Sequence, residues 1–276
     1  MTGVVWLNGA LLPEAKARID PADRGFLLAD GVFETLRVAD GGIWHLPRHL
    51  ARLRAGAAML GLPLPFPDAE ILTGMRGVLA RCGWQPGSLR LTLTAGPGPR
   101  GLLRPPDVRV TVLVTAAPAA PEPQPAALIV SAATRRNQHS PLSRIKALGY
   151  GDQLLARREA AQRGADDAIL LNGAGALAGA SAANLLLHNG VSWLTPPVAD
   201  GALPGITRGL LIEAGLLREQ TLWPADLATA TQLLLVNALG MRPVKRLDDR
   251  PFQPLPSLIA PLVAAARDPD IAPTPF

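Results

Sequence analysis

The length, composition and charge of the chain exclude several classes of protein. Its 276 residues, 48% of them apolar, suffice for one large globular domain or two of ordinary size. One cysteine, Cys82, excludes an intramolecular disulfide and a cysteine zinc cluster, so we expect no metal site. The net charge of +5 would permit nucleic-acid binding, but the arginines are scattered and aromatic residues make up only 4%. We therefore expect small anionic ligands and no nucleic-acid partner.

The chain also lacks the sequence signals of membrane insertion. No apolar run reaches about 18 residues, and residues 1–12 lack a basic start followed by a long apolar stretch. We expect a cytoplasmic protein with no membrane partner.

The first part of the chain predicts strands interspersed with two helices. Asn8-Gly9 is typical of a tight two-residue turn, because it supplies the positive φ angles that such a turn needs. Gly41-Gly42 predicts a second turn, and Pro47 suits the first turn of a helix. The predicted strands are residues 4–7, 10–12, 32–38, 43–46, 89–93 and 108–114, and the predicted helices are 47–60 and 68–82.

Two segments in the middle of the chain need separate interpretation. Gly96, Gly98 and Gly101 have the spacing of a dinucleotide-binding fingerprint, but that motif must open a helix, and the paired prolines in residues 102–107 prevent one. Residues 117–126, APAAPEPQPA, are typical of a stiff extended linker. We therefore predict an N-terminal domain of residues 1–116, a linker of 117–126, and a C-terminal domain of 127–276.

The second part of the chain again mixes strands and helices. Gly205, followed by Thr207 and an apolar-periodic run, predicts a backbone turn entering a helix, where N–H groups and the helix dipole favour a phosphate. An ordinary helix start capped by Thr207 is the alternative. The predicted strands are residues 128–132, 168–171, 184–188, 191–194, 232–237 and 243–247, and the other helices are 150–163 and 257–266.

Lysine is rare in this chain, and one lysine stands beside the single tyrosine. Lysine occurs only at Lys16, Lys146 and Lys245, whereas arginine supplies nearly all the positive charge. A lysine amine can form a Schiff base with an aldehyde, which arginine cannot do. Tyr150 lies four residues beyond Lys146, so a helical turn would bring the phenol beside the amine. A surface lysine near an ordinary buried tyrosine is the alternative.

Several motifs in one order resemble the class IV, fold-type IV, pyridoxal-phosphate enzymes. This family includes branched-chain and D-amino-acid aminotransferases and aminodeoxychorismate lyases. The resemblance covers almost the whole chain and implies a two-domain α/β (α+β) fold with the cofactor in the interdomain cleft, and a homodimer. The matching stretches are DRGFLLADGVFETLRV, HLARL, RRNQHSPLSRIKALGY, residues 160–172, ASAANLLL, LTPPVADGALPGITR and VNALGMRPV.

The resemblance implies roles for three residues at the cofactor's ring and phosphate. Lys146 would carry pyridoxal 5'-phosphate as a Schiff base and then move a proton between the substrate and the cofactor. Tyr150 would hydrogen-bond the phenolic oxygen of the cofactor, and Arg52 would pair with its phosphate.

Further positions follow from the same resemblance. Backbone amides of Ile206 and Thr207 would bind the phosphate, and Ala238-Leu239 would add a second backbone contact. Phe33 would lie against the substrate. Arg100 would bind a substrate carboxylate, for which its planar guanidinium is suited, although a solvated loop arginine is the alternative.

One departure from the family pattern concerns the cofactor's pyridine nitrogen. Relatives place a glutamate there, five residues before an asparagine, whereas this chain has Gly179 five residues before Asn184. A carboxylate at this place keeps the ring nitrogen protonated and so helps the ring accept electrons. We therefore hypothesise that the protein binds the cofactor at this site but catalyses transamination poorly, or uses a step that needs less electron withdrawal.

The glycine-rich loop helps to choose among the family's activities. D-amino-acid aminotransferases tend to have a histidine two residues after the loop arginine, and here that position is Leu102. The loop and the Asn237-Ala238-Leu239 run look more like aminodeoxychorismate lyase, which yields 4-aminobenzoate and pyruvate from a small amino substrate. The alternatives are a D-amino-acid or branched-chain aminotransferase, and a cofactor-binding protein with impaired catalysis.

Overall fold

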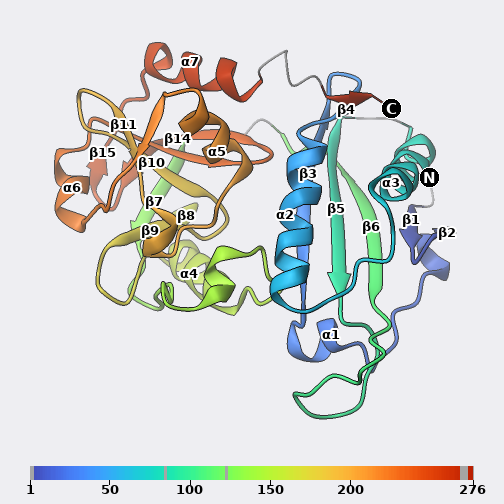
Figure 1. Ribbon diagram of the computed structural model, residues 1–276. Coiled ribbons are helices and arrows are strands. Elements are labelled where there is room, and N and C mark those ends of the chain that lie inside the picture. The colour runs from blue at the N-terminus through green and yellow to red at the C-terminus, as the bar shows by residue number, and fades with distance from the viewer. Residues whose placement is uncertain (1–2, 84–85, 122–123, 268–272, 276) are drawn as a thin grey trace. The chain divides into compact units, whose positions relative to one another are not determined.

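The computed structural model describes residues 3–83, 86–121, 124–267 and 273–275, which form two compact units (Figure 1). Unit 1 comprises the chain up to Ala120, together with Ile145–Gly149 and the C-terminal residues from Ala272. Unit 2 comprises Pro121–Arg144 and Tyr150–Ile271. No helix among the described residues is both long enough and apolar enough to cross a bilayer.

Unit 1 is built on an antiparallel sheet, seven-stranded in the described part of the chain, with the order β16-β4-β3-β5-β6-β1-β2. Its central strands alternate between a buried apolar face and a polar face, as a half-buried strand requires. The strands are β1 (Val4–Leu7), β2 (Ala10–Pro13), β3 (Gly31–Ala39), β4 (Gly42–Ile43), β5 (Gly87–Thr94), β6 (Thr111–Pro118) and β16 (Thr274–Pro275), and the helices are α1 (Arg24–Leu28), α2 (Leu46–Met59) and α3 (Asp68–Arg81), with a short 3-10 helix at Glu14–Lys16.

Helices α2 and α3 cover the apolar face of this sheet. Helix α2 runs along β3, as Figure 1 shows, and buries one apolar stripe of leucines and alanine. The stripe and the strand residues beneath it form one core cluster, whose fully buried members include Leu36, Ile43, Leu50, Leu53, Leu89 and Leu91. The opposite face of β3 and β5 therefore remains for polar side chains.

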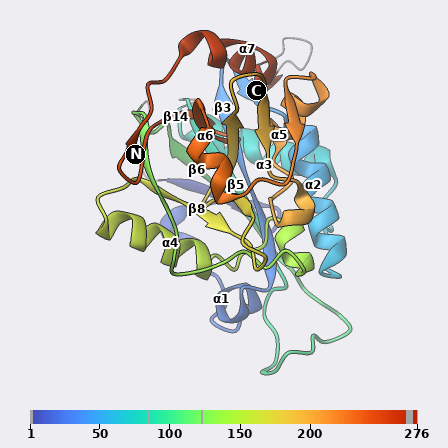
Figure 2. The same cartoon turned by 90° about the vertical axis from the view of Figure 1, so that its left-hand side faces the viewer.

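Unit 2 is built on a second sheet, nine-stranded in the described ranges. The order is β12-β11-β10-β13-β14-β7-β8-β9, with β15 paired to β14, and three of the strand pairs are parallel. Helix α4 lies beside β8, as Figure 2 shows. The strands are β7 (Ala126–Val130), β8 (Asp167–Leu171), β9 (Leu177–Ala180), β10 (Asn184–His188), β11 (Trp193–Thr195), β12 (Leu217–Glu219), β13 (Gln232–Asn237), β14 (Gly240–Leu247) and β15 (Arg250–Pro251). The helices are α4 (Gly151–Gln162), α5 (Ile206–Glu213), α6 (Pro224–Thr229) and α7 (Pro256–Ala266), with short 3-10 helices at Pro141–Arg144 and Val198–Asp200.

Most predicted elements are confirmed, with shifts at their ends that have local causes. The Asn8-Gly9 hairpin is confirmed, and both residues have positive φ angles, 49° and 91°. The predicted strand 43–46 is wrong beyond Ile43, because His45 has a left-handed φ of 54° and caps α2. The predicted strand 108–114 begins only at Thr111, where pairing with β5 begins. Helix α7 continues through Pro261.

The segment that carries Lys146 belongs to unit 1, whereas the sequence boundaries assigned it to the C-terminal domain. The reason is backbone pairing with β3. Val32 and Ala147 form an antiparallel bridge, and the Leu148 amide donates to the Gly31 carbonyl at 3.0 Å. The chain therefore enters unit 1 for five residues and then returns to unit 2 at Tyr150.

Candidate cofactor and substrate site

Lys146 lies directly opposite Phe33 in this antiparallel pairing. The Phe33 amide donates to the Lys146 carbonyl at 2.9 Å. The segment from Lys146 to Tyr150 is bridged to β3 and is not helical, so the helical turn is wrong, and the place of the Tyr150 phenol beside the Lys146 amine stays a prediction. Tyr150 is the N-cap residue of α4 in unit 2, and its side chain makes no capping hydrogen bond.

Two cations flank the ring of Phe33. The Lys146 Nζ atom lies 4.4 Å from the ring centroid, and the Arg90 Cζ atom lies 3.7 Å from it. The ring itself is 5% exposed. Phe33 is thus a buried aromatic platform between the lysine predicted to be reactive and an arginine of β5.

Arg52 is held by a buried carboxylate on the other face of β3. Its Nε atom donates to Glu34 Oε1 at 2.7 Å, and its Nη2 atom donates to Glu34 Oε2 at 2.6 Å. The Nδ1 atom of His49 lies 2.7 Å from the same Oε2 atom. His49 and Arg52 are three residues apart on α2, and Glu34 is the group that joins them.

The surroundings of Glu34, His49 and Arg52 determine the charge states of these three side chains. Burial opposes ionisation of Glu34, but the hydrogen bonds from Arg52 and His49 outweigh it and hold its pKa below the ordinary value. Burial lowers the pKa of His49, against the opposing effect of Glu34. His49 is therefore a neutral donor at neutral pH, and Arg52 and Glu34 form an ion pair.

The loop between β5 and β6, which contains Arg100, is closed at its base by Asp23. One carboxylate oxygen of Asp23 accepts from the Thr94 hydroxyl at 2.9 Å and from the Thr111 hydroxyl at 2.7 Å, and these threonines face each other across β5 and β6. Its other oxygen accepts from the Gly25 amide at 2.7 Å and caps α1. Asp23 therefore joins both ends of the loop to the start of α1.

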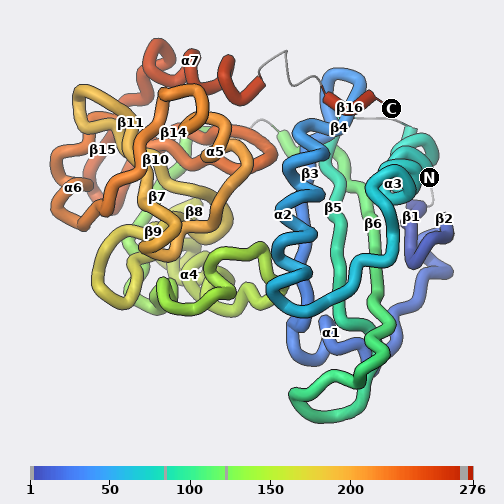
Figure 3. The backbone as a smooth tube through the Cα atoms, in the orientation of Figure 1, coloured from blue at the N-terminus to red at the C-terminus, as the bar shows by residue number. Residues whose placement is uncertain are grey.

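The far part of the same loop is held by Arg24. This side chain, 3% exposed, donates to the carbonyls of Gly101 and Leu102 and to Asp30, each at 2.9 Å. Arg104 donates to both Asp30 oxygens. The hydrogen bond from Arg104 is the main cause that lowers the pKa of Asp30. Figure 3 shows the loop beside α1. Arg100 itself is exposed, and its predicted contact with substrate stays a prediction.

In unit 2, the start of α5 has the features of an anion site. Gly205 is the N-cap, and a Cβ atom there would lie 2.0 Å from Asn184 Oδ1, so a side chain does not fit. Asn184 in turn donates to the Leu203 carbonyl at 2.9 Å and fixes the approach to the helix. The amides of Ile206 and Thr207 are in the first helical turn, where backbone donors lack intrahelical acceptors. This backbone cradle fits the predicted phosphate.

The β13–β14 turn lies against the same helix start. The Thr207 hydroxyl donates to the Asn237 carbonyl at 2.8 Å, so Thr207 does not cap α5, which corrects the alternative interpretation. The Leu239 amide donates to Asn237 Oδ1 at 2.9 Å and is engaged within the turn. Of the predicted Ala238-Leu239 pair, we therefore retain the Ala238 amide as the candidate phosphate donor.

Gly179 lies in β9 next to an irregularity in the pairing with β8. It pairs with Leu170, and the register shifts between Leu170 and Leu171. Its φ angle is 144°, which favours glycine, and a Cβ atom would lie 3.3 Å from the Ala183 carbonyl oxygen. The backbone therefore disfavours a larger residue here, independently of any role toward a cofactor.

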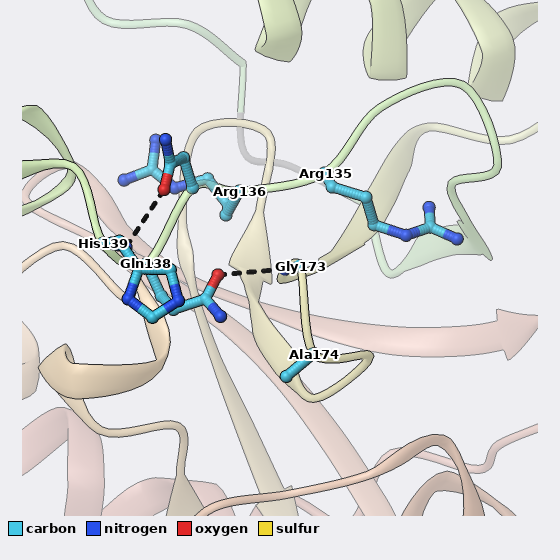
Figure 4. A pocket seen from close by; sticks show the side chains of 7 residues that line it. Arg135, Arg136, Gln138, His139, Gly173 and Ala174 are labelled. Carbon is cyan, nitrogen blue, oxygen red and sulfur yellow. Dashed lines mark hydrogen bonds between the residues drawn. The ribbon is translucent and has the colours of Figure 1, made fainter.

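A pocket of about 440 Å³ lies near the loop that precedes Lys146 (Figure 4). Its two arginines donate to backbone carbonyls: Arg135 to Ser131 and Thr134, and Arg136 to Gly201 and Ser143. Burial lowers the pKa of Arg136, partly offset by Tyr150 and Asp152. The pocket contains none of the predicted site residues, and its arginines serve to hold the loop. It is lined by Arg135, Arg136, Asn137, Gln138, His139, Gly173 and Ala174.

The groups that hold the predicted residues in place have weak signals in the sequence. Glu34 and Asp30 lie within the stretch DRGFLLADGVFETLRV, and Glu34 shares one side of the predicted strand with Leu36 and Val38. An acidic residue on the apolar side of a strand is the available signal for a paired cation. The sequence alone does not single out Arg90, because its place beside Phe33 depends on the β3–β5 register. No group of three or more His, Cys, Asp or Glu that could bind a metal occurs in the described ranges.

The chain matches a known protein family. The model for "Amino-transferase class IV" matches residues 31–247. A Methanocaldococcus jannaschii protein provisionally assigned as a branched-chain-amino-acid aminotransferase is 32% identical, covering 89% of this chain and 88% of that protein. The D-alanine aminotransferase of Bacillus licheniformis is 29% identical, covering 74% and 72%.

The fold is shared with solved structures of the same family. A structure from Legionella pneumophila, provisionally assigned as a 4-amino-4-deoxychorismate lyase, has a TM-score of 0.84 and 28% identity, covering 91% of this chain and 94% of that one. The predicted fold class, a fold-type IV arrangement of two sheets with helices, is confirmed. Enzymes of this fold type use pyridoxal 5'-phosphate. The chain therefore belongs to the class IV aminotransferase family of pyridoxal-phosphate enzymes.

Proposed function

We propose that the protein is an aminotransferase that acts on the amino group of a small α-amino carboxylate. The observation that carries this proposal is that Lys146 lies opposite Phe33 in the pairing with β3, with Lys146 and Arg90 both against the Phe33 ring. The relatives support this alternative better than the lyase activity that the loop sequence favoured.

The bound cofactor supplies an electron-accepting ring that acidifies the substrate's α-carbon. The roles of the protein groups are as follows in this proposal. The Lys146 amine would hold the cofactor and would carry the proton at the reacting carbon. Tyr150 donates to or accepts from the phenolic oxygen and so orients the ring. Phe33 excludes water beside the amine.

Each unit has its own candidate donors for the phosphate. Arg52 supplies positive charge, and Glu34 and His49 hold its guanidinium in one orientation. The Ile206, Thr207 and Ala238 amides supply neutral donors in a backbone cradle. Fixed donors of this kind anchor a phosphate without a metal ion.

Gly179 lowers the rate of transamination that we expect. The carboxylate that relatives place near the pyridine nitrogen is missing from this position, so the proposal includes slow transamination unless another group substitutes. The backbone φ of Gly179 supports the interpretation that the local structure has adapted to glycine.

A second candidate is aminodeoxychorismate lyase activity, which the glycine-rich loop and the similarity to the Legionella structure favour. A substrate panel separates the two. The cofactor-loaded protein is incubated with L-leucine, D-alanine or aminodeoxychorismate, and products are measured with and without an added keto acid. Keto-acid formation that needs an acceptor for repeated turnover supports the aminotransferase, whereas 4-aminobenzoate and pyruvate without an acceptor support the lyase.

We also propose that the chain assembles as a homodimer. Large apolar side chains are exposed on α1 and on the loop beside it: Phe26 is 77% exposed, Leu27 57%, Leu102 84% and Leu103 88%. Apolar groups held together at a surface favour contact with another protein. Light scattering at several concentrations measures the mass, and a monomer throughout would contradict this assembly.

A further inference from the structure

Asn237, the last residue of β13, is hydrogen-bonded to three other segments of unit 2. Its backbone carbonyl accepts from the Thr207 hydroxyl at 2.8 Å, which joins it to the first turn of α5. Its side-chain Oδ1 atom accepts from the Leu239 amide at 2.9 Å, within the β13–β14 turn. Its Nδ2 atom donates to the Ala182 carbonyl at 3.3 Å, in the connection between β9 and β10. One residue therefore links both candidate phosphate segments to a third part of the unit.

The β13–β14 turn depends on this side chain, because its central residues do not suit a tight hairpin. Asn237 pairs with Gly240, so Ala238 and Leu239 are the two central residues. Two-residue hairpins favour turns with a positive φ angle at one or both central positions, and neither of these residues has one. An asparagine side chain stabilises a turn by accepting from the backbone amide two residues on, as Asn237 does here. We therefore attribute the conformation of this turn to the Asn237 side chain.

The turn leaves the Ala238 amide available to a ligand. This amide has no acceptor among the described residues, whereas the neighbouring Leu239 amide is bound by Asn237. Helix α5 packs against β13, the strand between β10 and β14 in the sheet (Figure 1). The Ala238 amide can serve the same phosphate as the amides at the start of α5 only while the turn keeps its conformation.

We infer that Asn237 is a positioning residue for the cofactor's phosphate. It acts through Ala238: the bond from its Oδ1 atom to the Leu239 amide holds the turn, and the bond from its Nδ2 atom to Ala182 holds the side chain in that orientation. The inference rests on the proposed function, because that proposal puts the phosphate at the start of α5. A side chain with this role affects the binding of the phosphate and not the binding of the rest of the cofactor.

The test uses two ligands that differ in the phosphate group, pyridoxal 5'-phosphate and pyridoxal. Protein freed of cofactor is titrated with each, absorbance reports binding, and each ligand is compared across the variants. Asn237→Ala removes both side-chain bonds, whereas Asn237→Ser keeps a hydroxyl that can accept from the Leu239 amide. Asn189→Ala is the matched control, because Asn189 accepts in the same way from the Val191 and Ser192 amides after β10. Melting temperatures verify that each variant is folded.

We expect Asn237→Ala to lower the affinity for pyridoxal 5'-phosphate about five- to tenfold and to leave the affinity for pyridoxal unchanged. Serine holds a turn more weakly than asparagine, so the affinity of Asn237→Ser for the phosphate ester lies between those of wild type and Asn237→Ala. Asn189→Ala binds both ligands as the wild type does. Equal losses for the two ligands in Asn237→Ala, or no loss for either, overturn the role of Asn237 and leave the proposed function standing. Wild-type protein in which borohydride never fixes the cofactor to Lys146 overturns both.

Discussion

Glu34 and Arg52 form a bidentate ion pair in which the carboxylate is fully buried and the arginine side chain is 12% exposed. His49 adds a third hydrogen bond to the same carboxylate, at 2.7 Å. A buried pair of this kind costs desolvation, so breaking it leaves one charge without its partner.

Glu34→Gln is therefore expected to destabilise the protein by about 3 kcal/mol and to weaken cofactor binding. The glutamine keeps the shape but leaves the guanidinium of Arg52 uncompensated. Chemical denaturation and a titration with pyridoxal phosphate measure the two effects. Glu70→Gln, at an exposed position in the first turn of α3, is the control. Loss of stability with unchanged cofactor affinity would separate Glu34 from the phosphate site.

Lys146→Arg is expected to abolish covalent attachment of the cofactor, because a guanidinium does not form a stable Schiff base. Borohydride reduction followed by peptide mapping should label Lys146 in wild-type protein and nothing in the variant. Lys245→Arg is the matched control and should label normally. Label at Lys16 or Lys245 in the wild type would contradict the assignment.

Substitutions at Gly179 test the hypothesis that the absence of a carboxylate at this position slows transamination. Gly179→Glu and Gly179→Gln impose the same strain at a φ of 144°, about 1–3 kcal/mol, so they differ only in charge. If the ring nitrogen lacks a partner, Gly179→Glu turns over an amino-acid substrate faster than Gly179→Gln. Single-turnover rates with equal cofactor loading make the comparison. Equal rates, or a slower glutamate variant, would sink the hypothesis.

The free energy of unfolding is expected to rise with pH just below neutrality. Burial lowers the pKa values of His49 and His188 from 6.5, so the unfolded chain binds more protons than the folded chain between those lowered values and 6.5. Each group contributes a slope of at most about 1.4 kcal/mol per pH unit, and the contribution is complete above 6.5.

Denaturation curves at a series of pH values measure this slope. His49→Gln should remove one part of it and His188→Gln the other. Asp30 and Glu34, whose pKa values are lowered from 3.8 and 4.5, act only in more acidic solution, where their stabilisation is lost as pH falls. A slope that neither histidine variant changes would assign the proton uptake to other groups.

Asp30→Asn is expected to loosen the loop between β5 and β6. Asp30 accepts from both Arg24 and Arg104, and Arg24 holds the carbonyls of Gly101 and Leu102. Without the carboxylate, trypsin should cleave after Arg100 several times faster in native protein, since cleavage follows local opening. Asp152→Asn, on α4, is the control. Equal cleavage rates would show that Arg24 holds the loop without Asp30.

The sequence predicts the elements of the fold better than it predicts the contacts between them. Turns such as Asn8-Gly9 and alternation along residues 32–38 are local signals, and the structure has both. Local signals do not predict the position of Lys146, because the pairing of its segment with β3 joins residues more than 100 positions apart. The contacts of Asp23 with Thr94 and of Arg24 with Gly101 join residues 71 and 77 positions apart. Such contacts leave no periodic pattern in a single sequence.

The pairing of residues 146–148 with Gly31–Phe33 also has a consequence for synthesis of the chain. Along β3, strand β4 pairs with Val38 and Ala39, so it protects the other end of β3. Until the ribosome has delivered the lysine segment, the first residues of β3 present an unpaired edge, and exposed edges recruit other strands. A fragment that stops at Ala120 is accordingly expected to aggregate, and a synthetic peptide spanning 143–150 should slow that aggregation.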